Sequence, residues 1–97
     1  MSLTTADIQK AMKIKKAVTE YFDSSTQTTV MAKDLMKLFI SKGIFTKDHQ
    51  EGFPIREFLR ELEKDKNLKL IPQAHFEQKE QNKNWYFIKS NKYHYDL

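Results

Sequence analysis

The chain contains no cysteine and only two glycines among its 97 residues. Without cysteine it can form no disulfide, no thiolate nucleophile and no Cys-based zinc site, which agrees with a reducing compartment. Two glycines are too few for a glycine-rich phosphate-binding loop. No apolar run is long enough to span a bilayer, and the N-terminal stretch lacks the apolar segment of a secretory signal. We therefore expect a cytoplasmic protein without a membrane partner.

The composition that remains is typical of a small folded domain. Hydrophobic residues make up 39% and aromatic residues 12% of the chain, which argues against disorder. The length suits one domain, so we expect a single domain over residues 1–97 with a mobile tail at 91–97. The formal net charge of +4 favours contact with polyanions, nucleic acids among them.

Residues 53–66 have the pattern of a short amphipathic helix. Four apolar side chains recur at the spacing that places them on one side of a helix: Ile55, Phe58, Leu59 and Leu62. Pro54 suits the first helical position, and Gly52 before it lets the chain turn in. Three basic residues spaced four apart form a row on the solvent side: Arg56, Arg60 and Lys64. A cationic row displayed on a helix indicates a binding surface.

Two further helices are predicted before this one. Thr4 and Asp7 form a capping box that begins a helix extending to Phe22. A very short strand is expected over residues 28–30, followed by a mainly apolar helix over residues 31–42. Gly43 stands in the position after the last turn, where it ends that helix.

The C-terminal third is predicted to be rich in strands. Residues 68–71 alternate as a strand that Pro72 confines to an edge or bulge. Residues 74–80 and 85–89 form a hairpin through the polar turn 81–84. That turn places Glu80 opposite Trp85, although it lacks the Asn-Gly pair that fixes a register.

This order of elements resembles the winged-helix domains of the helix-turn-helix superfamily. TTVMAKDLMKLF is similar to their first strand and supporting helix, FPIREFLRELEK to the third helix, and AHFEQKEQNKNWYFIK to the wing. The resemblance implies an α+β fold, a small winged-helix-like domain with three helices, a C-terminal β-hairpin and a short first strand. The polar connection from residue 44 to 53 is longer than the tight turn of the simplest members.

The resemblance also implies a DNA-binding module that reads double-stranded DNA with its third helix and wing, as a regulator or an accessory of a mobile element or phage. Arg56 and Arg60 would lie nearest to base edges or phosphates, because the guanidinium group can grip guanine or phosphate in two places. Lys64 would touch the DNA backbone. Further phosphate contacts would come from lysines of the wing and the first helix: Lys79, Lys83, Lys10, Lys13 and Lys16.

Other functions fit parts of the same pattern. Acidic residues on the third helix would repel phosphate, and a helix with both signs of charge is often only a solvated face: Glu57, Glu61, Glu63 and Asp65. The first alternative is a protein-interaction module that forms a homodimer or joins a larger complex through its second helix or its aromatic hairpin. The second is an RNA or single-strand binder whose exposed rings stack on bases.

No catalytic constellation is visible in the sequence. The three histidines are far apart and have no helix-spaced partner, so no metal site is expected: His49, His75 and His94. The serines lack the context of a nucleophile elbow. We therefore expect no enzyme activity, no cofactor and no small-molecule substrate.

Overall fold

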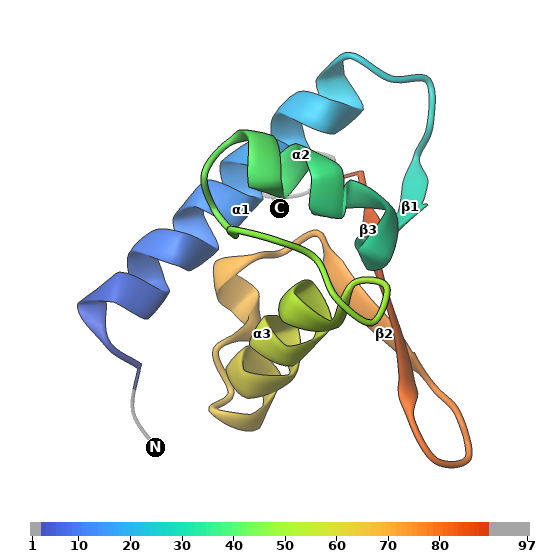
Figure 1. Cartoon of the computed structure of the whole chain (residues 1–97). Helices are drawn as coiled ribbons and strands as arrows, with labels where there is room; N and C mark the ends of the chain where they lie inside the picture. The colour runs from blue at the N-terminus through green and yellow to red at the C-terminus, as the bar shows by residue number, and fades with distance from the viewer. Residues whose placement is uncertain (1–2, 90–97) are drawn as a thin grey trace, which may run out of the picture.

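The structure is a computed structural model that describes residues 3–89. Its elements follow in the order α1 (Thr5–Asp23), β1 (Thr29–Met31), the 3₁₀ helix η1 (Ala32–Leu35), α2 (Met36–Ser41), α3 (Phe53–Lys64), the 3₁₀ helix η2 (Leu68–Leu70), β2 (Ala74–Gln78) and β3 (Lys83–Ile88) (Figure 1). The prediction of a small α+β fold with three α-helices, a C-terminal hairpin and a short first strand is thereby confirmed for the described residues. The predicted mobile tail at 91–97 lies outside them.

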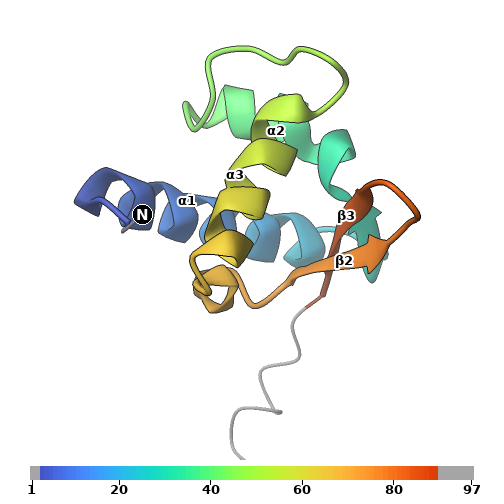
Figure 2. The same ribbon diagram turned by 90° about the horizontal axis from the view of Figure 1, so that it is seen from below.

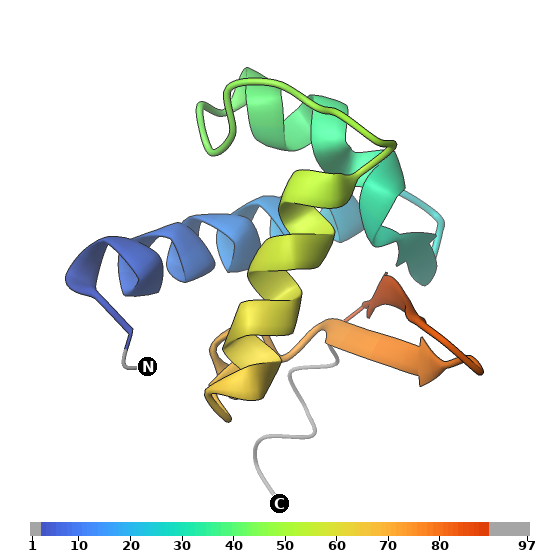
Figure 3. The same ribbon diagram turned by 60° about the horizontal axis from the view of Figure 1, so that its bottom comes forward.

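One hydrophobic core joins the helices to the sheet. All three α-helices and β3 contribute large, fully buried side chains to it, among them Phe22, Phe39, Ile55, Leu59 and Phe87. In two views of the molecule α3 crosses in front of α1, and the hairpin lies beside α3 (Figures 2 and 3). The apolar side of α3 is buried in the core, whereas Arg60 and Lys64 of the basic row are exposed and Arg56 is half-buried. Within residues 3–89 no helix has the combined length and apolar character needed to cross a membrane.

The ends of the first two helices form as their residues predict. The Thr4 hydroxyl accepts from the Asp7 N–H at 3.0 Å, and the Asp7 carboxylate accepts from the Thr4 N–H at 3.2 Å. After α2, Gly43 adopts a φ of 74°, and the N–H of Ile44 donates to the Phe39 carbonyl at 2.9 Å. This hydrogen bond returns Ile44 to the core. The second helix begins later than predicted, because residues 32–35 form the tighter η1 turn.

α3 ends, like α2, with a residue in the left-handed region, but this residue is Lys66 rather than glycine. Lys66 has a φ of 61°, and the N–H of Asn67 donates to the Leu62 carbonyl at 2.8 Å. Because an L side chain in the left-handed region is strained, Lys66→Gly is expected to raise the free energy of unfolding by about 0.5–1 kcal/mol. Urea denaturation followed by circular dichroism measures this difference. Lys64→Gly, inside the helix, is the control and should lower the free energy of unfolding by about 1 kcal/mol. Equal effects of the two changes would contradict a strained left-handed conformation at Lys66.

The three strands form one antiparallel sheet in the order β1-β3-β2. Phe76 pairs with Trp85, so the predicted register that set Glu80 opposite Trp85 is wrong. The turn occupies residues 79–82, two positions earlier than predicted, and the N–H of Lys79 donates to the Asn82 carbonyl at 2.7 Å. The partner of Trp85 differs from the predicted one by four residues, an even number, so residues that share a face in the predicted register still share a face. It also brings the Phe76 and Trp85 rings within 5.0 Å of each other.

The strand predicted over residues 68–71 is not formed. The chain turns through η2 instead, with the N–H of Ile71 donating to the Leu68 carbonyl at 2.9 Å. Ile71 is fully buried and the two leucines of η2 pack against the core. A turn lets these closely spaced apolar side chains reach the core while the chain reverses between α3 and β2.

Candidate nucleic-acid interface

The loop of residues 48–52, called the α3 loop here, sets where α3 begins. Three successive residues have left-handed backbone angles: Gln50 at 51°, Glu51 at 48° and Gly52 at 91°. The N–H of Gly52 donates to the Asp48 carboxylate at 2.8 Å. Gly52 is buried and its backbone lies directly against Lys33 of η1. The start of α3 is therefore held against η1 by a close backbone contact.

Arg56 connects α3 to this loop. Its guanidinium donates to the Glu51 carbonyl at 2.6 Å and to the Gln50 carbonyl at 3.1 Å. These two bonds satisfy carbonyl groups of the left-handed residues. Arg56, predicted to lie nearest to base edges, is half-buried and already has two backbone partners. It positions the first turn of α3 and adds positive charge there.

Arg60 lies one turn further along α3 and is paired with Glu57. Its Nη2 donates to Oε1 of Glu57 at 2.6 Å and also contacts Oε2. This hydrogen bond raises the pKa of Arg60 further above its ordinary value, so the side chain stays charged at any accessible pH. The Arg60 side chain is 59% exposed. Exposed ion pairs contribute little to stability, so a phosphate group can compete with Glu57 for Arg60.

Lys64 lies in the last turn of α3 and is exposed. Within residues 3–89 its side chain has no hydrogen bond or ion pair. It borders a shallow depression together with residues of both charges: Arg60, Glu61, Glu63 and Lys66. The predicted row is therefore real as an arrangement on α3, but only Lys64 of its three members is without an intramolecular partner in the described chain.

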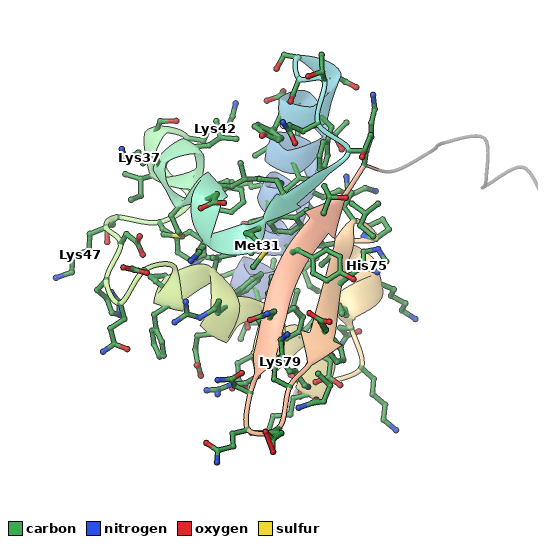
Figure 4. All side chains as sticks on the ribbon, turned by 90° about the vertical axis from the view of Figure 1, so that its right-hand side faces the viewer. Met31, Lys37, Lys42, Lys47, His75 and Lys79 are labelled. Carbon is green, nitrogen blue, oxygen red and sulfur yellow. The ribbon has the colours of Figure 1, made fainter. Side chains whose placement is uncertain are left out.

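The two predicted lysines of the hairpin, Lys79 and Lys83, have partners on different elements. Lys83 Nζ donates to Oε1 of Glu63 at 2.8 Å and lies 4.4 Å from the centre of the Phe76 ring. This lysine therefore turns back toward α3. Lys79 lies on the hairpin (Figure 4), is exposed, and pairs with Glu77 at 3.3 Å.

Arg56, Arg60 and Lys83 meet along a groove of about 330 Å³ between α3 and the hairpin. We call it the α3–hairpin groove. Its other lining residues are two aromatic side chains, three amides and one carboxylate: Phe53, Trp85, Gln78, Gln81, Asn82 and Glu57. The amides were not among the predicted site residues, because only the true position of the turn brings them beside α3. Charged and amide groups together can hydrogen-bond both phosphates and base edges.

The lysines predicted on the first helix lie outside this groove. Lys10 is half-buried, with Nζ 4.8 Å from the centre of the Phe45 ring and 5.6 Å from that of Phe58. Lys13 and Lys16 are exposed and border a separate depression with Lys42. The eight predicted residues therefore do not form one surface. Three line the groove, Lys64 borders the depression next to it, Lys13 and Lys16 border the depression on α1, and Lys10 and Lys79 line none of the three.

The histidines of the described chain make ring contacts. His75 stacks on Tyr86 with ring centres 5.9 Å apart, and His49 lies 5.3 Å from Phe53. In the span from residue 3 to 89, no three acidic or histidine side chains gather in a way that could hold a metal ion.

Comparisons with models of protein families, with curated proteins and with solved structures find no match to this chain.

Proposed function

We propose that this protein binds double-stranded DNA through the α3–hairpin groove and the exposed end of α3, acting as a cytoplasmic regulator or accessory protein without enzyme activity. The observation that carries the proposal is the convergence of three cations from two separate elements on one groove, beside three amide side chains. The order of helices and strands resembles that of winged-helix domains, and this analogy supports the proposal.

The charge balance supports binding that depends strongly on salt. Five basic residues border the groove and the depression next to it: Arg56, Arg60, Lys64, Lys66 and Lys83. Three carboxylates oppose them: Glu57, Glu61 and Glu63. The excess of positive charge is modest, so we expect about three phosphate contacts and a slope of log affinity against log salt of about −3.

The amides of the hairpin supply groups that can recognise bases. Asparagine and glutamine side chains can pair with adenine, and arginine with guanine. Gln81 and Asn82 are exposed in the turn, where they are free to enter a groove of the duplex. We assign them to base-edge contacts, and the lysines to phosphate contacts.

The alternatives have less support from the described residues. Trp85 is only 4% exposed, which leaves little ring surface for stacking on single-stranded bases. The large hydrophobic side chains that are exposed within residues 3–89 lie on α1 and β3, and α2 contributes none of them: Ile8, Met12 and Ile88. Within the described residues a homodimer or larger complex built on α2 would therefore have no exposed large hydrophobic side chain to bury, and one built on the aromatic hairpin would have Ile88.

A titration of a labelled random duplex tests the proposal. The variant Arg60→Ala/Lys64→Ala should bind about tenfold more weakly at low salt, and its salt slope should be smaller by about 2 because two phosphate contacts are lost. Fluorescence anisotropy at several salt concentrations gives both quantities.

The matched control for this titration is Lys37→Ala/Lys47→Ala. It removes the same charge from exposed positions on α2 and on the loop after it, both labelled in Figure 4. The control should retain most of the affinity. Equal affinities of the two double variants would remove α3 from the contact with DNA.

A further inference from the structure

A second concave surface lies between α1 and the end of α2. It has a volume of about 340 Å³ and is bordered by four charged and two apolar residues: Lys13, Lys16, Glu20, Lys42, Ala17 and Ile44. We call it the α1–α2 basic depression. It shares no lining residue with the α3–hairpin groove. In Figure 4, Lys42 of this depression is labelled well away from Lys79, which lies on the hairpin.

The depression combines a cationic rim with an apolar floor. Lys13 and Lys16 are exposed on the same side of α1, because they are three residues apart. Ala17 is 1% and Ile44 is 7% exposed, so they form the bottom. Ile44 is there because the hydrogen bond that ends α2 folds it back onto the helix. The hydrogen bond that ends α2 therefore places part of the apolar floor of the depression.

A carboxylate already occupies part of this rim. Lys42 Nζ donates to Oε1 of Glu20 at 2.8 Å, across the depression from α2 to α1. The hydrogen bond from Lys42, followed by the charge of Lys42 and that of Lys16, lowers the pKa of Glu20 below its ordinary value. The rim thus stabilises an ionised carboxylate, while three lysines surround only this one acidic side chain.

We propose that the α1–α2 basic depression docks an acidic peptide segment of a protein partner, with carboxylates on Lys13 and Lys16 and one aliphatic side chain on the floor. The lining has two more positive than negative charges, so the depression itself is complementary to an acidic peptide. Its volume of about 340 Å³ is at the lower end of the range found for ligand pockets, so it has room for a small part of a partner. The protein would then hold DNA on one surface and an acidic partner on the other.

A peptide fits this surface better than a nucleic-acid backbone does. Phosphates and sugars are contacted by charged and polar groups and need no apolar floor. The floor of Ala17 and Ile44 instead matches an aliphatic side chain, and apolar anchors within a polar rim are typical of protein contacts. A second nucleic-acid contact is therefore the competing outcome of the test.

The test uses a fluorescein-labelled peptide of about 10 residues made only of aspartate, glutamate and leucine. Anisotropy should show binding to the unaltered protein, and Lys13→Glu/Lys16→Glu should weaken it by about tenfold or more. The control Lys64→Glu/Lys79→Glu makes the same change in net charge at exposed positions of α3 and the hairpin. It should weaken binding by only about twofold. Equal losses in both variants would mean attraction by net charge, which overturns the proposal.

Two further measurements separate the competing explanations. A peptide with serine in place of leucine should bind several-fold more weakly if the floor is used, and unchanged binding would contradict a peptide anchor there. Duplex DNA is titrated with the same variants. If Lys13→Glu/Lys16→Glu weakens duplex binding more than the control on α3 does, the depression is part of the nucleic-acid surface and the docking proposal fails.

The folded state of each variant is checked by its unfolding curve, and Lys13→Gln/Lys16→Gln repeats the test with a smaller change. Both positions are exposed, so the glutamine variant should fold as the parent does. It should still weaken peptide binding by about threefold. Peptide binding and duplex binding are measured separately. If the protein does not bind DNA, the peptide-docking proposal is unaffected, and if it does not bind the peptide, the DNA proposal is unaffected.

Discussion

Replacing Gly52 by alanine is expected to lower the free energy of unfolding by at least about 3 kcal/mol. A Cβ at this position would lie 2.4 Å from Cβ and 2.7 Å from Cα of Lys33, and one of these two atoms belongs to the backbone. Gly52 also has a φ of 91°, which an L side chain rarely adopts. The α3 loop and η1 would have to separate to accept even one methyl group.

Urea denaturation of Gly52→Ala and Gly43→Ala measures the two costs side by side. Gly43 has a φ of 74°, but a Cβ there would meet nothing within 4 Å. Its replacement therefore loses only the backbone preference, about 1 kcal/mol. A Gly52→Ala protein as stable as Gly43→Ala would show that the contact with Lys33 relaxes without cost.

The same contact connects stability to the proposed DNA surface. Arg56 reaches back to the carbonyls of Gln50 and Glu51, which directly precede Gly52. Moving the α3 loop would therefore move the Arg56 side of the α3–hairpin groove. A Gly52→Ala protein that still folds should bind duplex DNA less tightly than the parent.

The parts of the fold that could be predicted are those formed by hydrogen bonds between residues close in sequence, such as helix ends. Thr4 with Asp7, and Gly43 with Ile44, define helix ends through hydrogen bonds between near neighbours, and both motifs form as predicted. The hairpin register could not be predicted, because a slip of an even number of residues keeps the same faces buried. Contact between the Phe76 and Trp85 rings accompanies the observed register. That contact depends on packing rather than on a turn motif.

The sequence predicted which residues of the candidate site share a side of α3, but not which groups those residues contact. The spacing of Arg56, Arg60 and Lys64 placed them on the outer side of α3. The carbonyls that Arg56 binds belong to a left-handed loop in which Gln50 and Glu51 give no glycine signal. The separation of Lys13 and Lys16 from α3 depends on how α1 packs. The apolar periodicity of a single helix does not predict this packing.

The double variant Glu57→Gln/Glu63→Gln is expected to bind duplex DNA roughly 10- to 100-fold more tightly at low salt. Glu57 holds Arg60, and Glu63 holds Lys83 at 2.8 Å. Glutamine keeps the shape of each side chain but removes its charge, so both cations become available to phosphates. Two fixed negative charges beside the DNA backbone are lost as well. The fold should persist, since Lys83 keeps its contacts with the Phe76 and Trp85 rings.

The matched control for this gain is Asp23→Asn/Asp34→Asn, which raises the net charge equally at exposed positions on α1 and η1. Its effect should be small, because these carboxylates are outside the α3–hairpin groove. The gain of the glutamine variant should also shrink as salt rises, with a steeper slope than the parent, since more counterions are released. If the glutamine variant binds no more tightly than the control, Arg60 and Lys83 do not contact DNA, and the ion pairs that hold them are only parts of a solvated surface.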